Sequence, residues 1–339
     1  SMPVNRRRFL IAAGALAATP AVVSCSRTPD QRPPGVPVSR FGADSTALEV
    51  TAGIDLTGRT ILVTGATSGL GLETMRVLAL RGAHVIGSGR TLDKAKAACE
   101  SVQGRTTPIA LELERWDSIV TASDLVRTLG MPLDGIVCNA GIMALPQLEQ
   151  VYGLEKHLVV NHLGHFILVN RLLPQVQAAP QGRVVVVSSL GYQWAPEAGI
   201  EFDNLDGRRG YEPNRMYGQS KLANGLFSIE LARRLRESGA TATSNAVHPG
   251  IINTNLGRHF AAWKRAAGKL IGWTFMKSVE AGAATSCYVA TAPALASVSG
   301  RYFEDCNPVV PKVGKHMEDA ALAAALWQKS EELTARYLT

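Results

Sequence analysis

The fold is decided by the stretch Thr64-Gly65-Ala66-Thr67-Ser68-Gly69-Leu70-Gly71. It follows a β-branched run at 61–64 and opens a helical pattern that continues to about residue 81. Glycine serves where a chain turns tightly and where the backbone must closely approach a pyrophosphate. The N–H groups at the start of the next helix, together with the helix dipole, favour an anion there. The stretch therefore predicts a phosphate-binding turn between a strand and a helix.

The same alternation of strand and helix continues along the chain. Short β-branched runs each precede a longer helical pattern, at 61–64, 84–88, 135–138, 183–188 and 243–247. Strands separated by helices at this spacing predict βαβ units and a parallel sheet. The run Val184-Val185-Val186-Val187 is apolar throughout, as expected of a strand buried on both faces. We expect an α/β fold, with a single doubly wound Rossmann-type domain over 55–339, a parallel sheet and helices on both faces.

Composition excludes several classes of protein. The net charge of +7 comes mostly from residues 1–40, which hold six Arg and one Asp, so a globally basic nucleic-acid binder is not expected. The five Cys form no CxxC pair and no Cys/His cluster with zinc spacing, which argues against a disulfide framework and against a metal site. Cys138 lies in an apolar run and is interpreted as a small core residue.

Further motifs follow the glycine stretch in a fixed order. They are Cys138-Asn139-Ala140-Gly141, Asn161 in Val-Asn-His-Leu-Gly-His-Phe, Ser188-Ser189, Tyr217-Gly-Gln-Ser-Lys221 and His248-Pro249-Gly250-Ile-Ile-Asn-Thr254. This set, over residues 60 to about 305, resembles the short-chain dehydrogenase/reductase family. The stretches Tyr217-Gly-Gln-Ser-Lys-Leu-Ala-Asn and Gly300-Arg-Tyr-Phe are similar to its retinol-dehydrogenase-like branch, which includes light-dependent protochlorophyllide reductases. The chain lacks the Cys arrangement expected near the active site of a tetrapyrrole reductase.

The resemblance implies four catalytic residues: Asn161, Ser189, Tyr217 and Lys221. Tyrosine, with an ordinary pKa of about 10, is a poor proton-transfer group near neutral pH unless its phenolate is stabilised. Lys221 lies on the same helix face four residues later, and its charge is expected to lower the pKa of Tyr217. Ser189 would hydrogen-bond to the substrate oxygen, and the resemblance implies that Asn161 holds a water that passes protons to the Lys. Taken alone, Tyr217 would be a half-buried aromatic at a helix start.

The end of the second strand carries the choice of cofactor. An NAD site places Asp or Glu about 20 residues after the glycines, whereas Ser88-Gly89-Arg90 stands here. Arg90 can make charge-assisted hydrogen bonds to a 2′-phosphate, so we expect NADP rather than NAD; the alternative is a solvated Arg. The turn and the resemblance together assign the cofactor-binding residues: Gly65, Thr67, Ser68, Gly69, Leu70, Gly71, Arg90, Glu112, Leu113, Asn139, Ala140, Gly141, Tyr217, Lys221, Pro249, Gly250, Ile252 and Thr254.

The spacing between Ser189 and Tyr217 departs from the commoner form of the family. They are 28 residues apart, where about a dozen is usual. We expect residues 190–215 to form an insertion at the mouth of the site. The alternatives are a surface loop or a contact between subunits of a homo-oligomer.

The N-terminus resembles an export signal. Arg6-Arg7-Arg8-Phe9-Leu10 precedes an apolar stretch that is too short for a comfortable membrane span. The arginines resemble a twin-arginine signal, and Val22-Val23-Ser24-Cys25 resembles a lipobox whose Cys becomes lipidated. We expect a signal-like leader (1–25), a Pro-rich linker (26–54) and a location in the cell envelope or periplasm. The alternative is an N-terminal helix that packs on the domain of a cytoplasmic protein.

Residues 255–279 follow the segment that closes over the nicotinamide in the family, and they are expected to form a substrate lid. Within 255–277, apolar residues recur at helical spacing, with Phe260 and Trp263 among them, while Lys264 and Arg265 lie off that stripe. A basic amphipathic helix with aromatic anchors can bind a membrane surface. With a lipid on Cys25 it would provide two anchoring signals. The alternative is a lid that packs on its own active site or on a neighbouring subunit.

Three classes of function remain from the sequence. The first is an NADP(H)-dependent oxidoreductase that interconverts a small hydrophobic alcohol and its aldehyde or ketone. The second is an exported oxidoreductase or epimerase with tightly bound, internally recycled NADP, since free nucleotide is scarce outside the cytoplasm. The third is a non-catalytic nucleotide-binding module, against which the intact set of four catalytic residues argues.

Overall fold

This computed structural model describes residues 32–252 and 276–339. The chain divides into two units, Ser1–Gln31 and Arg32–Thr339, and every described residue belongs to the second. The predicted leader with Cys25, the residue Thr254 and most of the predicted lid lie outside the described residues.

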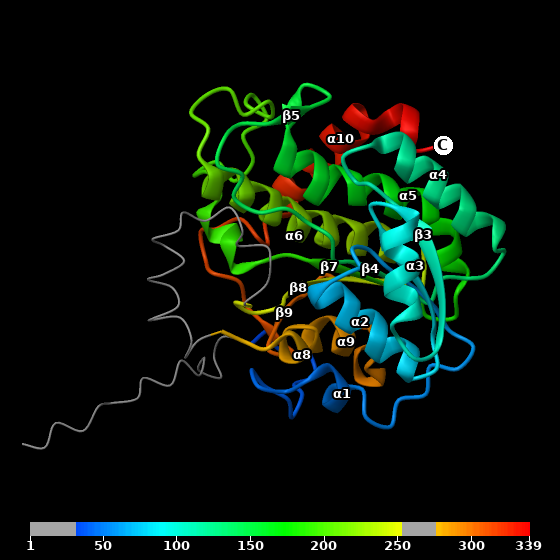
Figure 1. Ribbon diagram of the computed structural model, residues 1–339. Helices are drawn as coiled ribbons and strands as arrows, with labels where there is room; N and C mark the ends of the chain where they lie inside the picture. The colour runs from blue at the N-terminus through cyan, green and yellow to red at the C-terminus, as the bar shows by residue number, and fades with distance from the viewer. Residues whose placement is uncertain (1–31, 253–275) are drawn as a thin grey trace, which may run out of the picture. The chain divides into compact units, whose positions relative to one another are not determined.

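A single large sheet organises the described part of the chain (Figure 1). Its eight strands follow the order β10-β9-β8-β7-β4-β1-β2-β3, and all neighbours are parallel except β9 and β10. The strands are β1 (Thr60–Val63), β2 (His84–Gly89), β3 (Arg105–Ala110), β4 (Gly135–Cys138), β7 (Arg183–Val187), β8 (Thr243–His248), β9 (Tyr302–Glu304) and β10 (Asn307–Val309). A separate hairpin consists of β5 (Gln150–Val151) and β6 (Leu154–Glu155).

Helices cover both faces of this sheet. The α-helices are α1 (Ala47–Val50), α2 (Gly69–Leu80), α3 (Leu92–Glu100), α4 (Trp116–Thr128), α5 (Gly164–Ala178), α6 (Pro213–Glu237), α8 (Val279–Gly282), α9 (Ala284–Thr291) and α10 (Ala320–Thr334). Shorter turns are the π-helix η2 (Leu158–Leu163) and the 3₁₀-helices η3 (Leu190–Trp194), η5 (Pro293–Leu295) and η6 (Ala335–Tyr337).

Two apolar cores result, because successive side chains of a strand point to opposite faces. Leu62 and Val184 pack with α4, α5, α6 and α10, whereas Ile61 and Val185 pack with α1, α2, α3 and α9. Burying one such side chain contributes about 1.5–3 kcal/mol. The predicted doubly wound fold with helices on both faces is confirmed.

The edge strand β10 differs from the prediction of a parallel sheet. It runs antiparallel to β9 because Asp305 and Cys306, which join the two strands, both adopt positive φ angles of 50° and 60°. A two-residue turn of this kind reverses the chain within a hairpin. The local pattern around residues 302–309 is too short to predict it.

The domain also begins earlier than the predicted boundary at residue 55. Within the predicted linker, Ala47 and Val50 of α1 are buried, and α1 packs on the core through α9. Upstream of α1, Asn307 accepts from Ser39 N at 2.8 Å and donates to the Phe41 carbonyl at 2.8 Å. Residues 39–54 are therefore part of the folded domain.

Candidate active site

The glycine turn closes between the ends of β1 and β4. Gly65 has a φ of +65°, and a Cβ on Gly71 would lie 2.1 Å from the Gly65 carbonyl oxygen, so both positions require glycine. Thr64 Oγ1 accepts from the backbone N–H groups of Asn139 and Ala140 at 2.9 and 3.0 Å. Helix α2 begins directly after this turn, at Gly69. The open backbone and the helix N-terminus fit the pyrophosphate of a dinucleotide.

Tyr217 and Lys221 lie in the first turns of α6. Glu212 caps this helix by accepting from Asn214 N and Arg215 N, and Pro213 occupies its first position. Ser188 Oγ donates to the Lys221 carbonyl at 2.8 Å, and Lys221 Nζ donates to the Val187 carbonyl at 3.2 Å. These bonds fix the start of α6 against the carboxyl end of β7.

Ser189 lies two residues after the end of β7 and meets Tyr217. Its hydroxyl accepts from Gly191 N at 3.0 Å and is also hydrogen-bonded to the Tyr217 side chain. A Cβ on Gly191 would lie 2.7 Å from the Tyr217 ring, so this glycine leaves room for the tyrosine beside the serine. Two hydroxyl groups thus come together at the end of a central strand, which suits hydrogen bonding to one substrate oxygen.

The pKa of Tyr217 differs from the expectation. Burial raises it to about 12, and the hydrogen bond from Ser189 only partly opposes this increase. Burial also lowers the pKa of Lys221 to about 8. The expected lowering of the tyrosine pKa by Lys221 is absent from this structure, because the Nζ atom lies 5.7 Å from the ring centre and bonds to Val187.

Asn161 lies in the π-helix η2, an irregularity that is frequent at functional sites. Its Nδ2 donates to the Ile142 carbonyl at 3.0 Å and to Ser220 Oγ at 2.9 Å, while its Oδ1 accepts from Ile142 N at 2.8 Å. The asparagine therefore holds the backbone that follows β4 against α6. The predicted role in holding a water stays a prediction.

Sequence reasoning missed His165. It bonds through Nδ1 to the Asn161 carbonyl at 3.0 Å and through Nε2 to Thr64 Oγ1 at 2.8 Å. Burial lowers its pKa to about 4, so the imidazole is neutral at pH 7. The ring joins the glycine turn to the catalytic asparagine. The spacing of four residues from Asn161 is the one local signal that could have indicated it.

Comparison with known proteins places this geometry in a family. The model of short chain dehydrogenases matches residues 59–265. The chain belongs to the short-chain dehydrogenase family. It is 39% identical over 305 residues to Short-chain dehydrogenase TIC 32 A, chloroplastic, from Brassica napus, covering 87% of this chain and 94% of that protein. It is 38% identical over 297 residues to retinol dehydrogenase 14 from Homo sapiens, covering 81% and 85%.

Two further matches agree. Polyprenol dehydrogenase from Mus musculus is 37% identical over 283 residues, which covers 82% of this chain and 84% of that one. A crystal structure of an uncharacterized protein from Mycobacterium paratuberculosis aligns with a TM-score of 0.69 at 33% identity, covering 84% and 97%. The protein is thus a short-chain dehydrogenase/reductase enzyme, and its family binds NAD(P).

Among the described residues, several other predicted cofactor residues lie at this same edge of the sheet. Thr67 packs closely on Gly89, because a Cβ on Gly89 would lie 2.6 Å from the Thr67 Cγ2 atom. The end of β2 therefore adjoins the glycine turn. The side chains of Leu70 and Ile252 both pack against Gly282. A Cβ on Gly141 would lie 3.1 Å from Asn161 Oδ1 and 3.6 Å from Lys221 Nζ. Pro249 and Gly250 follow β8 at this edge, and Leu113 packs under Gly164.

Besides Lys221, the predicted cofactor set has two charged members, Arg90 and Glu112. Arg90 is exposed immediately after β2, two residues after Ser88, whose Oγ accepts from Gly65 N at 3.2 Å. Glu112 follows β3 and lies 3.8 Å from Arg115. Arg90 therefore lies at the same end of the sheet as the glycine turn.

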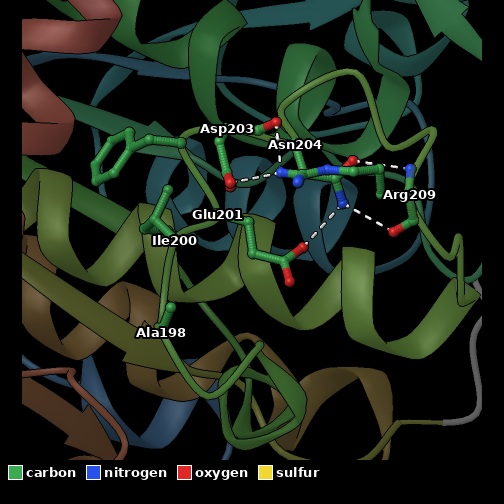
Figure 2. Close-up of a pocket in the computed structure, with 7 residues that line it drawn as sticks. Ala198, Ile200, Glu201, Asp203, Asn204 and Arg209 are labelled. Carbon is green, nitrogen blue, oxygen red and sulfur yellow. Dashed lines mark hydrogen bonds and ion pairs between the residues drawn. The ribbon is translucent and has the colours of Figure 1, made fainter.

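The insertion at residues 190–215, before α6, is held together by hydrogen bonds and ion pairs among its own residues. A hollow of about 580 Å³ is lined by insertion residues alone, among them Ile200 and Phe202 (Figure 2). Arg209 bonds to Asp203 at 2.6 Å, and its backbone exchanges two 3.0 Å bonds with the side chain of Asn204. The four predicted catalytic residues do not line this hollow. The polar groups around it bond to one another, which indicates a rigid loop.

The described residues also limit what else the chain carries. Among the helices of residues 32–252 and 276–339, none has the length and hydrophobicity that crossing a membrane requires. Over the same ranges, no three His, Cys, Asp or Glu side chains gather where they could hold a metal ion. Cys138 is buried at the end of β4, as its interpretation as a core residue predicts.

Proposed function

We propose that the protein is an NADP(H)-dependent oxidoreductase that interconverts a hydrophobic alcohol and its aldehyde or ketone. The observation that carries this proposal is the hydrogen-bonded pair of hydroxyls, Ser189 and Tyr217, beside the buried Lys221. The relatives named retinol dehydrogenase 14 and polyprenol dehydrogenase support a hydrophobic alcohol as the substrate class. The exposed Arg90, with no acidic residue at the end of β2, supports NADP over NAD.

The chemistry follows from the protonation states of the two buried groups. With a pKa of about 12, Tyr217 keeps its proton at pH 7 and can donate it to a carbonyl oxygen. Ser189 hydrogen-bonds to the same oxygen as negative charge develops there. Bound NADP(H) supplies or accepts the hydride. In the direction of alcohol oxidation, Tyr217 first loses its proton to solvent, and the resulting phenolate takes the proton of the substrate hydroxyl.

Lys221 completes the proton-transfer group. With a pKa of about 8, it is mostly protonated at pH 7, so a buried positive charge lies 5.7 Å from the centre of the Tyr217 ring. Lys221 would also bind the ribose hydroxyls of the cofactor. Gly141 has no side chain to cover the Lys221 Nζ atom, which would lie 3.6 Å from a Cβ at that position. Asn161 holds the intervening backbone in place.

Apolar groups beside the tyrosine support a hydrophobic substrate. Trp194 of η3 lies 6.3 Å from the Tyr217 ring, measured between ring centres, and is 49% exposed. Ile251, after β8, is 58% exposed. Large apolar side chains left open to solvent at a site commonly mark a contact surface for an apolar ligand.

The test is a substrate screen on purified protein. Aldehydes and ketones of increasing chain length are offered with NADPH or NADH, and nucleotide is first extracted and identified by mass and redox state. Turnover with added NADPH supports the proposal. Turnover without added nucleotide, from a copurified NADP, would favour the internally recycling oxidoreductase or epimerase. Binding of nucleotide without turnover of any compound would favour the non-catalytic module.

We also propose that the enzyme acts at a membrane surface in the cell envelope. The twin-arginine-like leader, the lipobox-like Cys25 and the basic amphipathic stretch 255–277 support this. Protein lacking residues 1–31 is mixed with anionic liposomes at low and high salt. Salt-sensitive binding that is lost in Trp263→Glu and in Lys264→Glu supports the proposal. Absence of binding at low salt would contradict the contact through 255–277.

A further inference from the structure

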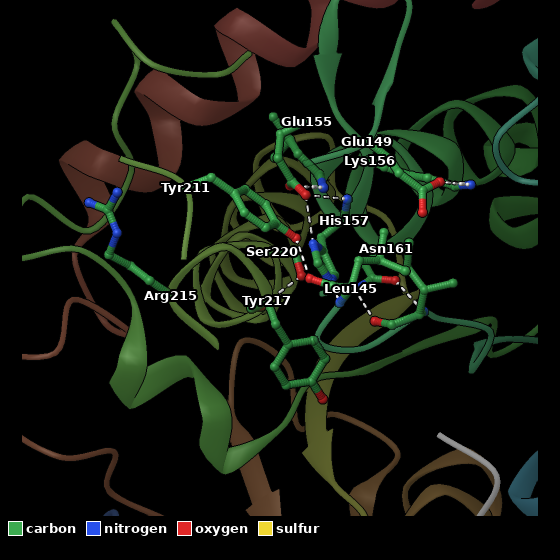
Figure 3. A network of polar contacts seen from close by, with 12 residues as sticks. Leu145, Glu149, Glu155, Lys156, His157, Asn161, Tyr211, Arg215, Tyr217 and Ser220 are labelled. Atoms are coloured by element: carbon green, nitrogen blue, oxygen red, sulfur yellow. Dashed lines mark hydrogen bonds and ion pairs between the residues drawn. The ribbon is translucent and has the colours of Figure 1, made fainter. Parts of the chain in front are cut away.

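The backbone of Leu145 is held at both its N–H and its carbonyl, as Figure 3 shows. On one side, Leu145 N donates to His157 Nε2 at 3.3 Å. On the other side, the Tyr211 hydroxyl donates to the Leu145 carbonyl at 2.8 Å. Burial raises the pKa of Tyr211, so this hydroxyl keeps its proton and serves as the donor. Two residues from distant parts of the chain thus fix the backbone of Leu145, at the end of the segment 142–145, which follows the predicted cofactor residue Gly141.

The imidazole of His157 is itself oriented by Glu155. Glu155 Oε1 accepts from His157 Nδ1 at 2.6 Å and from His157 N at 3.0 Å, and its Oε2 accepts from Leu158 N at 3.1 Å. A carboxylate can only accept, so Nδ1 carries the hydrogen and Nε2 is left as the acceptor for Leu145. Glu155 and His157 are 1% and 0% exposed. The pair is a buried, fully oriented hydrogen-bonding unit.

This unit lies beside the reacting groups. The His157 ring meets the Tyr217 ring edge-on, with 6.2 Å between ring centres. The other end of the same segment is bound by the catalytic Asn161, which bonds to both the N–H and the carbonyl of Ile142. Ala144, between these two anchors, has a φ of +48°, which is costly for a non-glycine residue. Segment 142–145 is therefore held in a strained shape by residues of the active site.

The insertion is docked on the same unit. Glu155 N donates to the Leu205 carbonyl at 2.8 Å, and Gln150 Nε2 donates to the Asp206 carbonyl at 2.7 Å. Gly207 packs so closely on Glu155 that a Cβ there would lie 2.9 Å from its Cγ. With the bond from Tyr211, these contacts join the insertion to segment 142–145 through one set of side chains.

We propose that Glu155, His157 and Tyr211 are positioning residues that fix segment 142–145 as a wall of the substrate pocket and so determine which carbonyl compounds the enzyme accepts. This inference rests on the proposed oxidoreductase function. The partly exposed side chains of Ile142 and Met143 are the groups that the wall presents. The glycine turn that holds the pyrophosphate has its own anchors in Thr64 and His165. A loosened wall therefore alters substrate kinetics and leaves cofactor affinity unchanged.

The test uses the full chain with three variants. His157→Leu removes both imidazole bonds, whereas His157→Gln keeps one donor and one acceptor. Tyr211→Phe removes the other bond to the Leu145 backbone, the one at its carbonyl. For each variant, kcat and KM are measured with propanal and with decanal, and the dissociation constant of NADPH is measured by fluorescence. Hydrogen exchange of the peptide covering 142–148 reports the hold on Leu145 independently of activity.

In His157→Leu we expect kcat/KM for decanal to fall by about 10- to 100-fold, since displacement by 1 Å can cost about 10²-fold. The decanal to propanal ratio should change by at least about fivefold, and the NADPH dissociation constant should stay within about twofold. His157→Gln should recover most of the loss. Tyr211→Phe should show the same pattern more weakly, and its effect should not add fully to that of His157→Leu, because both act on the backbone of one residue, Leu145. Exchange of 142–148 should accelerate in His157→Leu and Tyr211→Phe.

Several outcomes would overturn the inference. One is an unchanged substrate ratio in folded His157→Leu, and another is a parallel loss of NADPH affinity, which would indicate general damage. If His157→Leu does not fold, Tyr211→Phe decides, and an unchanged ratio and exchange rate overturn the proposal. If the wild type reduces neither aldehyde with NADPH, the proposed function fails. In that case the hydrogen-exchange rate of residues 142–148 still tests whether His157 and Tyr211 fix the Leu145 backbone. An unchanged rate in the variants rejects this, whereas a faster rate supports it.

Discussion

The ammonium group of Lys221 lies 5.7 Å from the centre of the Tyr217 ring and bonds to the carbonyl of Val187 at 3.2 Å. Both side chains are buried, at 5% and 7% exposure. Burial disfavours the charged form of each group, so it lowers the pKa of Lys221 to about 8 and raises that of Tyr217 to about 12. The site therefore keeps a charged lysine in the interior at pH 7, which favours catalysis at the expense of stability.

The first prediction concerns the stability that is lost by burying the charge of Lys221. Lys221→Met should stabilise the fold at pH 7 while it removes activity. Below about pH 8 the lysine is charged in both states, and the cost of burying the charge is fully present. Between about pH 8 and 10.5 the folded state has released the proton and the unfolded state still holds it, so wild-type stability rises relative to the variant. The difference between the folded pKa of about 8 and the ordinary lysine pKa of 10.5 corresponds to at most about 3 kcal/mol of unfolding free energy.

Urea unfolding from pH 7 to 10 measures this difference. The advantage of Lys221→Met should shrink as the pH rises above about 8. The matched control is Lys94→Met, which removes an exposed lysine of α3 and should leave the pH profile unchanged. A stability difference that is constant with pH would show that the charge of Lys221 is not its source.

The second prediction concerns the proton donor. Tyr217→Phe keeps the ring that packs against Gly191 and removes only the hydroxyl. We expect kcat to fall by about 10²- to 10⁴-fold, as is usual for loss of a general acid–base. The dissociation constant of NADP(H) should change little. Tyr152→Phe, which alters a half-exposed tyrosine that stacks on Trp116, serves as the control. Retention of more than about a tenth of kcat would remove Tyr217 from the mechanism.

The local parts of the fold and site could be predicted from the sequence. The turn at Gly65 and Gly71, the central strands and the spacing of Tyr217 and Lys221 all depend on neighbours within a few residues. Each has a direct signal in glycine placement, β-branched runs or helical period. The structure confirms the predicted fold from these signals.

Other features depend on residues far apart in the sequence. His165 reaches Thr64 across 101 positions, and Tyr211 reaches Leu145 across 66. The pKa of Tyr217 was predicted in the wrong direction, because the depth of burial dominates it and cannot be read from a four-residue spacing. The docking of residues 39–41 on Asn307 likewise has no local pattern.

The third prediction concerns export. A twin-arginine signal carries proteins that have already folded, so NADP would be bound before the protein leaves the cytoplasm. Replacing Arg6 and Arg7 with Lys should leave the protein in the cytoplasm of its native host, measured by cell fractionation and immunoblotting. Replacing Arg27 and Arg32 with Lys, outside the arginine motif, is the matched control and should leave export intact. Unchanged fractionation of the first variant would contradict the signal.

The last prediction concerns the choice of nucleotide. Gly89, at the end of β2, packs against Thr67 of the glycine turn, so the exposed side chain of Arg90 begins beside the turn at which we propose that the nucleotide binds. Arg90→Asp places a carboxylate where it repels a 2′-phosphate and accepts from a free 2′-hydroxyl. The preference for NADP should fall by at least about tenfold and turn toward NAD, since truncating or opposing a charge pair costs several kcal/mol. Ratios of kcat/KM for the two nucleotides measure this change. Arg59→Asp, the same change of charge just before β1 and at the opposite end of the strands, should leave the ratio unaltered. A wild type that already prefers NAD would show that Arg90 does not bind a 2′-phosphate.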